Sequence, residues 1–338
     1  MTAAMKGKHV PETFTIADAV ELAVVERSGF VESRHAGSAI VISADGAVLR
    51  SLGDVTTPIF PRSCLKPFQA VAIMSSGVTL RGEDAAIATA SHTGTTRHVE
   101  LARGLLARAG IPEAALACPP AMPQDSESRD VVVRTGGGKQ RVYMNCSGKH
   151  AAMLLACAQN GWPLDGYLEP EHPLQKRILD VIERFTGERP SASGVDGCGA
   201  PVHAISLTAL ARGIQRVATS TPSSPFAIFR EAGVLAEAVR ESGWVIAGPG
   251  EPDTLVIERL GVFAKTGAEG VMVMTAQNGT TVALKILDGS LRAATIVGLT
   301  LLADAGSIER SAVGALAPDL GLGIHGGDAV IGRIRATV

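Results

Sequence analysis

The sequence predicts a mixed α+β fold in which strands from both ends of the chain form one antiparallel sheet packed with a helical region. Strand-like segments gather near the two ends, while helical patterns dominate the middle, and this order does not match a parallel βαβ series. Hydrophobic residues make up 46% of the 338 residues and charged residues only 19%, which allows a large buried core.

The N-terminal part is predicted to supply the first strands. Residues 1–17 read as a loose leader, and Val20–Arg27 reads as a strand. Gly37–Ser43 and Ala47–Leu52 flank Ala44-Asp45-Gly46, which is a hairpin signal.

Helices are predicted for the periodic segments of the middle region and for one segment near the C-terminal end. Pro67 is tolerated only in the first turn of a helix, so Ser63–Lys66 should lie at the N-terminal end of a helix that runs through Met74. Gly110 is a C-cap signal for the helix before it. The other predicted helices span about 82–90, 96–109, 148–160, 173–185, 205–215, 225–241 and 291–305.

Further hairpins are predicted from glycine-containing turns. Val131–Arg134 and Arg141–Met144 flank a triple-glycine turn, and Asn278-Gly279 joins two strands in the C-terminal third. The strands expected there are Val262–Ala264, Gly270–Thr275 and Thr281–Leu287. Gly321–Gly326 matches GxGxxG, but only 12 residues follow it, so we interpret it as a loop rather than a nucleotide site.

Composition limits the domain organisation, location and partners. We expect one catalytic domain over 18–338, with an α/β lobe at about 18–62 and 250–338 and a mainly helical lobe at about 63–249. The balance of 31 Lys and Arg against 33 Asp and Glu argues against nucleic acid as a partner. No apolar run approaches the roughly 18 residues of a membrane span. Five Cys and no apolar N-terminal segment predict reduced thiols in a cytoplasmic protein.

A serine and a lysine have the spacing of a nucleophile and its base. Ser63 and Lys66 stand three residues apart at a predicted helix start, so the amine can reach the hydroxyl. By itself this SxxK pattern is weak, and a Ser N-cap with a solvated Lys is the favoured interpretation. Lys265-Thr266-Gly267 follows a predicted strand, and penicillin-recognising serine hydrolases pair SxxK with K-T-G in this order. A second cation there would lower the pKa of Lys66.

Three loops carry further reactive side chains. Ser91-His92-Thr93-Gly94-Thr95 could end a helix, or its serine could relay a proton between lysine and substrate. Cys146 and Cys198 lie in glycine-containing turns beside Lys149, His150 and Asp196. Two thiolates could bind one zinc ion, but two buried thiols in tight turns explain the pattern equally well.

Taken together, these motifs resemble the rhizobial-type (class 3) L-asparaginases, whose fold is similar to that of glutaminases and serine β-lactamases. The resemblance spans about Glu21 to Arg335. The matching segments, in order, are Arg62-Ser63-x-x-Lys66-Pro67, Ser91-His92-Thr93-Gly94, Asn145-Cys146-Ser147-Gly148-Lys149-His150, Asp196-Gly197-Cys198-Gly199-Ala200-Pro201 and Ala264-Lys265-Thr266-Gly267-Ala268-Glu269-Gly270.

The resemblance implies hydrolysis of L-asparagine to L-aspartate and ammonia by a homodimer. It implies Ser63 as the nucleophile with Lys66 as its base, and Ser91 and Lys265 as a second Ser–Lys pair. The remaining implied roles are a zinc site at Cys146, Lys149 and Cys198, and substrate contacts at Arg62, His150 and Asp196.

Other functions remain open at this stage. A glutaminase is a near variant, and a penicillin-recognising serine hydrolase shares SxxK and K-T-G. The chain lacks a clear Ser-Asp-Asn element, which counts against the second of these. A non-enzymatic zinc- or ligand-binding protein would need separate structural reasons for each polar motif.

Overall fold

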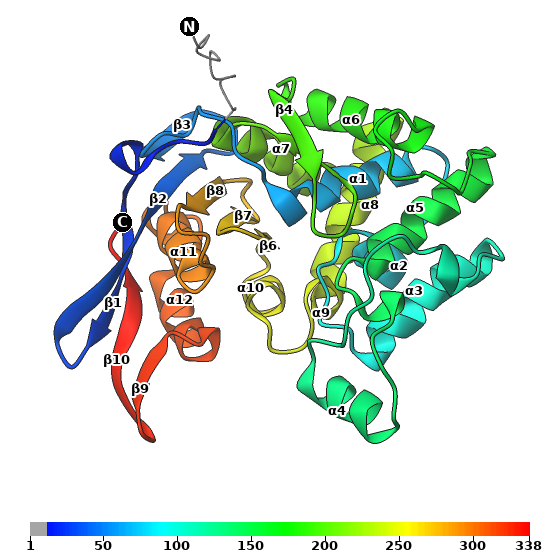
Figure 1. The fold of residues 1–338 in the computed structure, drawn as a ribbon. Helices are drawn as coiled ribbons and strands as arrows, with labels where there is room; N and C mark the ends of the chain where they lie inside the picture. Colours follow the sequence, from blue (N-terminus) through cyan, green and yellow to red (C-terminus); the bar gives the residue numbers. More distant parts are fainter. Residues whose placement is uncertain (1–11) are drawn as a thin grey trace, which may run out of the picture.

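Strands from the two ends of the chain are neighbours in one curled antiparallel sheet (Figure 1). The computed structural model describes residues 12–338. In it, β1 (Val20–Arg27) pairs with β2 (Phe30–Ile42) on one side and with β10 (Ala329–Ala336) on the other. The predicted α+β fold with an antiparallel sheet built from both ends is therefore confirmed.

The C-terminal third supplies the strands that border the functional site. They are β6 (Phe263–Gly267), β7 (Val271–Thr275) and β8 (Thr281–Ile286), and their order with the others is β6-β7-β8-β2-β1-β10-β9. β3 (Val48–Leu52) pairs with β2, and β9 (Gly323–Gly326) pairs with β10. β6 is thus an edge strand. Its outer side has no strand partner among the described residues and is next to the helical region.

Helices cover both faces of this sheet. α7 (Leu207–Thr219) contacts β2, β7 and β8, whereas α11 (Ala294–Asp304) contacts β7, β8 and β10 from inside the curl of the sheet (Figure 1). Gly298 of α11 lies so close to Met274 that a Cβ would come within 2.9 Å of its sulfur. Helices therefore cover the sheet core on both faces. The residues of the candidate site lie at the β6 edge of the sheet.

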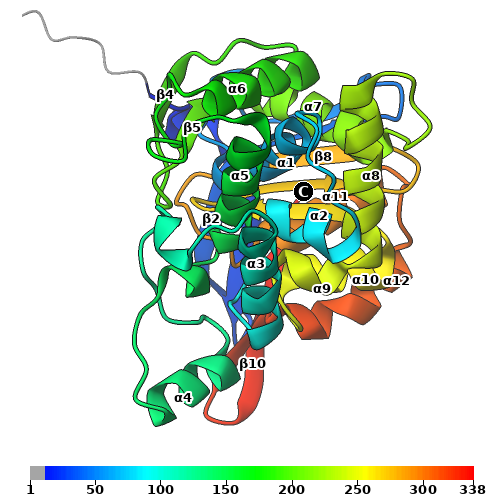
Figure 2. The same ribbon diagram turned by 90° about the vertical axis from the view of Figure 1, so that its right-hand side faces the viewer.

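The helical region stands in front of the β6–β8 strands in Figure 2. Its chain also includes a two-stranded hairpin, β4 (Ala192–Val195) with β5 (Pro201–Ala204). The other helices are α1 (Lys66–Met74), α2 (Gly82–Thr89), α3 (Thr96–Arg108), α4 (Ser126–Arg134), α5 (Ser147–Asn160), α6 (Pro173–Thr186), α8 (Ala227–Glu241), α9 (Gly243–Ile246), α10 (Pro252–Leu260) and α12 (Arg310–Leu316).

Two sequence predictions are wrong. The hairpin expected at 131–144 is a helix, α4, followed by a 3₁₀ turn at Arg141–Tyr143. Asp125 caps α4 by accepting a hydrogen bond from the Ser128 N–H at 2.8 Å, and this cap outweighs the β propensity of the valines. The loop expected at Gly321–Gly326 contains β9, because β10 provides it with a pairing partner.

Part of the predicted leader packs against the folded chain. Phe14 is only 3% exposed, and a 3₁₀ turn follows at Ile16–Asp18. Residues 1–11 of that leader lie outside the described residues. Within 12–338, every helix is too short or too polar to cross a lipid bilayer.

Candidate active site

A short 3₁₀ turn presents Ser63 beside the edge strand. The turn, Arg62–Leu65, leads directly into α1, and Arg62 adopts a left-handed backbone with φ of 54°. Gly267 of β6 packs against this turn so tightly that a Cβ would overlap the Pro61 carbonyl oxygen. The Cys64 thiol also donates to the Lys265 carbonyl at 3.2 Å, so the serine turn and the K-T-G strand are held together.

Three of the four predicted catalytic residues line one cavity of about 370 Å³. Ser63, Ser91 and Lys265 come from the 3₁₀ turn, the loop after α2 and the edge strand β6. Most ligand pockets measure roughly 300–1,000 Å³, so this cavity suits a small molecule. The complete lining is Ser63, Ser91, Gln124, Asn145, Glu251, Pro252, Asp253, Lys265, Thr266, Ala268, Leu291 and Thr295.

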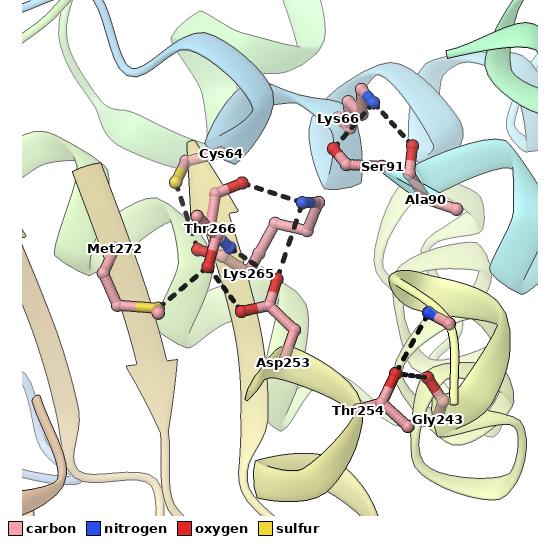
Figure 3. A network of polar contacts seen from close by, with 11 residues as sticks. Cys64, Lys66, Ala90, Ser91, Gly243, Asp253, Thr254, Lys265, Thr266 and Met272 are labelled. Carbon is pink, nitrogen blue, oxygen red and sulfur yellow. Dashed lines mark hydrogen bonds and ion pairs between the residues drawn. The ribbon is translucent and has the colours of Figure 1, made fainter. Parts of the chain in front are cut away.

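Lys66, the fourth catalytic candidate, lies directly behind the Ser91 hydroxyl. Its amine donates to Ser91 Oγ at 2.8 Å and to the Ala90 carbonyl at 2.5 Å (Figure 3). The side chain is 1% exposed. Burial lowers the pKa of Lys66, although the nearby Cys146 opposes this and Lys265 and Lys149 add to it. A lowered pKa favours the neutral amine, which can accept a proton.

Lys265 is paired with a carboxylate that sequence reasoning missed. Its amine lies 3.7 Å from Asp253 Oδ2 and donates to the Thr266 carbonyl at 2.8 Å. Asp253 accepts hydrogen bonds from the Thr266 N–H at 2.8 Å and from the Thr266 hydroxyl (Figure 3). The negative charge of Asp253 therefore compensates much of the positive charge that Lys265 presents to the cavity.

The predicted substrate contacts lie outside the lining of this cavity. Arg62 and Asp196 form an ion pair with each other, with Nε 2.7 Å from Oδ1. Burial opposes ionisation of Asp196, but the hydrogen bond and charge of Arg62 outweigh it and lower the pKa of that carboxyl. His150 is fully buried and bonds through Nδ1 to the Tyr167 hydroxyl at 2.6 Å.

The three predicted zinc ligands lie close together, outside the lining of the cavity. The Lys149 amine donates to Cys198 Sγ at 3.0 Å, and the Cys146 thiol donates to the Asn145 side-chain oxygen at 3.2 Å. The neighbouring Cys198 thiol lowers the pKa of Cys146 well below its usual value. Burial opposes the charge on Lys149, but the two cysteines outweigh it and raise the pKa of the amine.

This donor set fits a zinc ion in part. Thiolate sulfur is a good zinc ligand, and two sulfurs lie together here, but a zinc site needs four ligands or three and a water. A protonated amine has no lone pair, so Lys149 would have to lose its proton to coordinate. Among the described residues no group of three or more His, Cys, Asp or Glu could hold a metal ion.

Glu251 is a second cavity residue that sequence reasoning missed. It directly precedes α10, whose first residue is Pro252 and whose second is Asp253. Burial, then the charges of Asp253 and Asp125, raise the pKa of the Glu251 carboxyl. The available signal was the acid-Pro-acid order of Glu251, Pro252 and Asp253, because proline favours the first position of a helix and this helix leads to the strand that carries Lys265.

Comparison with known proteins gives a family for this chain. A family model described as L-asparaginase II matches residues 23–336. The chain belongs to the L-asparaginase II family. The match covers every site residue discussed above, and it confirms the family resemblance inferred from the motifs. No curated protein sequence matches the chain.

Solved structures of distant proteins are similar in outline to this member of the family. One is Mglu in its native form, with a TM-score of 0.46, 13% identity, and coverage of 80% of this chain and 64% of that one. A β-lactamase from Mycobacterium bovis has a TM-score of 0.43 and 15% identity, with coverage of 79% of this chain and 94% of that one. A Bacillus subtilis glutaminase, in covalent complex with 5-oxo-L-norleucine, has a TM-score of 0.36 and 14% identity. The match covers 81% of this chain and 89% of that one. This chain therefore spans less than two thirds of the length of Mglu.

Proposed function

We propose that this protein hydrolyses the side-chain amide of L-asparagine to give L-aspartate and ammonia through an acyl-enzyme on Ser63. The observation that carries the proposal is the single cavity lined by Ser63 and Ser91, with the Lys66 amine bonded to the second hydroxyl. Membership of the L-asparaginase II family supports an amide as the substrate.

In this mechanism the first step forms one bond and transfers two protons in a relay. Ser63 attacks the side-chain carbonyl carbon, its proton passes to Ser91, and the Ser91 proton passes to the Lys66 amine. The 2.8 Å hydrogen bond between Lys66 and Ser91 supports the second transfer, and the shared cavity of Ser63 and Ser91 supports the first. The Ser63 N–H and the backbone at Ala268 are our candidates for holding the oxyanion. Removal of one such donor typically costs about 10²–10³ in turnover.

The second step reverses the proton path. The Lys66 ammonium returns its proton through Ser91 to the amide nitrogen, and ammonia leaves. Water then attacks the Ser63 ester and gives a proton through Ser91 to the Lys66 amine. As the bond between the acyl carbon and Ser63 Oγ breaks, this proton returns through Ser91 to Ser63 Oγ, and aspartate leaves. Burial of Lys66 supports this cycle, because a lowered pKa makes it easier for the amine to exist in its neutral form and accept a proton.

A zinc ion is part of the proposal but not of the proton path. Cys146 and Cys198 would hold it, with Lys149 joining them only as a neutral amine. Bound there, zinc would balance the charge of the two thiolates and fix the position of Cys146, which is next to the cavity residue Asn145. Arg62, Asp196 and His150 would then shape the wall behind the site. We further propose a cytoplasmic homodimer whose catalytic domain spans 18–338, as the family resemblance implies.

The test is ammonia release from L-asparagine and L-glutamine, together with hydrolysis of the β-lactam nitrocefin. We expect asparagine to be the best substrate and Ser63→Ala to abolish turnover, while Ser290→Ala, a serine outside the cavity, stays active. Faster release from glutamine would identify a glutaminase instead. Rapid nitrocefin hydrolysis would favour a penicillin-recognising enzyme. An increase in thermal stability with asparagine, without turnover, would favour a non-enzymatic binding protein.

A further inference from the structure

The carboxylate of Glu251 lines the same cavity as the two serines and Lys265, and within residues 12–338 it forms no ion pair. Glu251 stands at the N-cap of α10, yet its side chain makes no capping hydrogen bond. The charged groups that act on it among the described residues are the carboxylates of Asp253 and Asp125, and both repel its charge. Glu251 is exposed to solvent, and a carboxylate that both of these neighbours repel is stabilised by a cation that enters the cavity.

The charges along the cavity wall do not balance. Lys265 contributes +1, and Asp253 and Glu251 contribute −1 each, so the lining carries 1 − 2 = −1. Lys265 and Asp253 lie 3.7 Å apart, and the Thr266 N–H and hydroxyl occupy the Asp253 oxygens. Asp253 is therefore paired with Lys265 and Thr266. The remaining negative charge of the lining is that of the Glu251 carboxylate. An anionic substrate without a cation would meet an unfavourable field here.

We propose that Glu251 binds the α-ammonium group of the substrate and thereby makes the site selective for amino acid amides over the same amides without an amino group. The inference rests on the proposed function and deepens it. An amino acid amide places an ammonium group a few bonds from the scissile carbonyl, so one small cavity can hold both next to Glu251 and Ser63. Binding of that group also fixes the direction in which the amide enters.

A pair of substrates isolates this contact. L-asparagine and succinamic acid share the side-chain amide and the carboxylate, and only asparagine carries the amino group. We expect Glu251→Gln to lower kcat/KM for asparagine by about 10- to 100-fold, mostly through KM, which is the usual range for a hydrogen bond to a charged group. The same substitution should leave kcat/KM for succinamic acid within about threefold of the unmodified enzyme.

Two controls separate this effect from a general loss. Glu258→Gln changes an exposed acid on the same helix, α10, and should affect neither substrate. Glu251→Asp keeps the charge on a shorter side chain and should retain part of the preference for asparagine. An equal loss on both substrates with Glu251→Gln, or no loss on either, would overturn the assignment of Glu251.

Failure of the proposed function gives a different result. If the unmodified protein releases ammonia from neither compound, the asparaginase proposal falls, and Glu251 is then tested by calorimetric titration with asparagine and with succinamic acid. Tighter binding of asparagine that disappears in Glu251→Gln would support ammonium binding. Equal affinity for the two compounds in the unmodified protein would refute it.

Discussion

The Lys66 amine donates a hydrogen bond to the Ser91 hydroxyl at 2.8 Å, whereas it has no hydrogen bond to Ser63 within residues 12–338. The SxxK spacing pointed to Ser63 as the direct partner. The structure instead puts one hydroxyl in contact with the base and a second in the same cavity. This relationship makes the roles of the two serines separable by experiment.

Chemical labelling distinguishes the serine that attacks from the serine that relays. We expect a diazoketone analogue of asparagine to attach to Ser63, as located by mass spectrometry of peptides. In Ser91→Ala the label should still reach Ser63, but about 10²–10⁴ times more slowly, since the proton path to Lys66 is broken. Attachment of the label to Ser91 in the unmodified protein would show that Ser91 is the nucleophile and Ser63 the proton relay.

Removal of the Asp253 charge should destabilise the protein. Asp253 is 4% exposed and Lys265 1% exposed, so Asp253→Asn leaves a buried ammonium without its carboxylate. Loss of one partner of a buried pair costs about 3–5 kcal/mol, which urea unfolding would measure. The double variant Asp253→Asn/Lys265→Met should recover part of that loss. A double variant as unstable as the sum of the two single ones would show that the pair is not coupled.

The zinc proposal predicts a difference between cysteines. Cys198→Ser should lower the zinc content, measured by elemental analysis of protein purified with zinc present. Cys157→Ser is the matched control, because Cys157 is also a fully buried thiol but lies near the far end of α5. Equal zinc in both variants, or none in the unmodified protein, would exclude Cys198 as a ligand.

His98 should make stability depend on pH on the acid side. Its ring lies 4.9 Å from that of His92 and 5.0 Å from that of Trp244, and burial lowers its pKa to about 4. The unfolded chain takes up this proton near pH 6.5 and the folded chain only near 4. Stability therefore falls as pH decreases from 6.5 to 4, with a slope of about 1.4 kcal/mol per pH unit for this one proton.

Comparison with a variant isolates that proton. His98→Asn should flatten the dependence of the unfolding free energy on pH between 6.5 and 4, whereas His325→Asn, an exposed position, should not. Free energies from urea unfolding at pH 7, 5.5 and 4.5 provide the comparison. Parallel curves for His98→Asn and the unmodified protein would contradict the prediction.

The sequence predicted those parts of the fold that local signals specify. Pro67 and Gly110 marked the ends of helices correctly, and Asn278-Gly279 marked a hairpin. Failures occurred where distant residues decide: β9 exists only because β10 pairs with it. At α4 the error was local, since Val131 and Val133 favoured a strand and the cap at Asp125 was overlooked.

The candidate site divides in the same way. Ser63, Lys66, Ser91 and Lys265 stand in recognisable motifs, and the structure brings them together. Asp253 and Glu251 carry no motif, and their relevance depends on where the start of α10 packs. Spacing along the chain also could not show that Arg62 and Asp196 form an ion pair with each other and do not line the cavity.

The pairing of β1 with β10 has a consequence for synthesis of the chain. A ribosome completes all the residues that line the cavity before it reaches Ala329, where β10 begins. Until then β1 lacks one neighbour and exposes a row of unpaired N–H and C=O groups, which is a surface to which other nascent chains can add. Strand β10 thus covers the free side of β1, and its loss by premature termination would leave β1 as an edge strand to which other chains can pair.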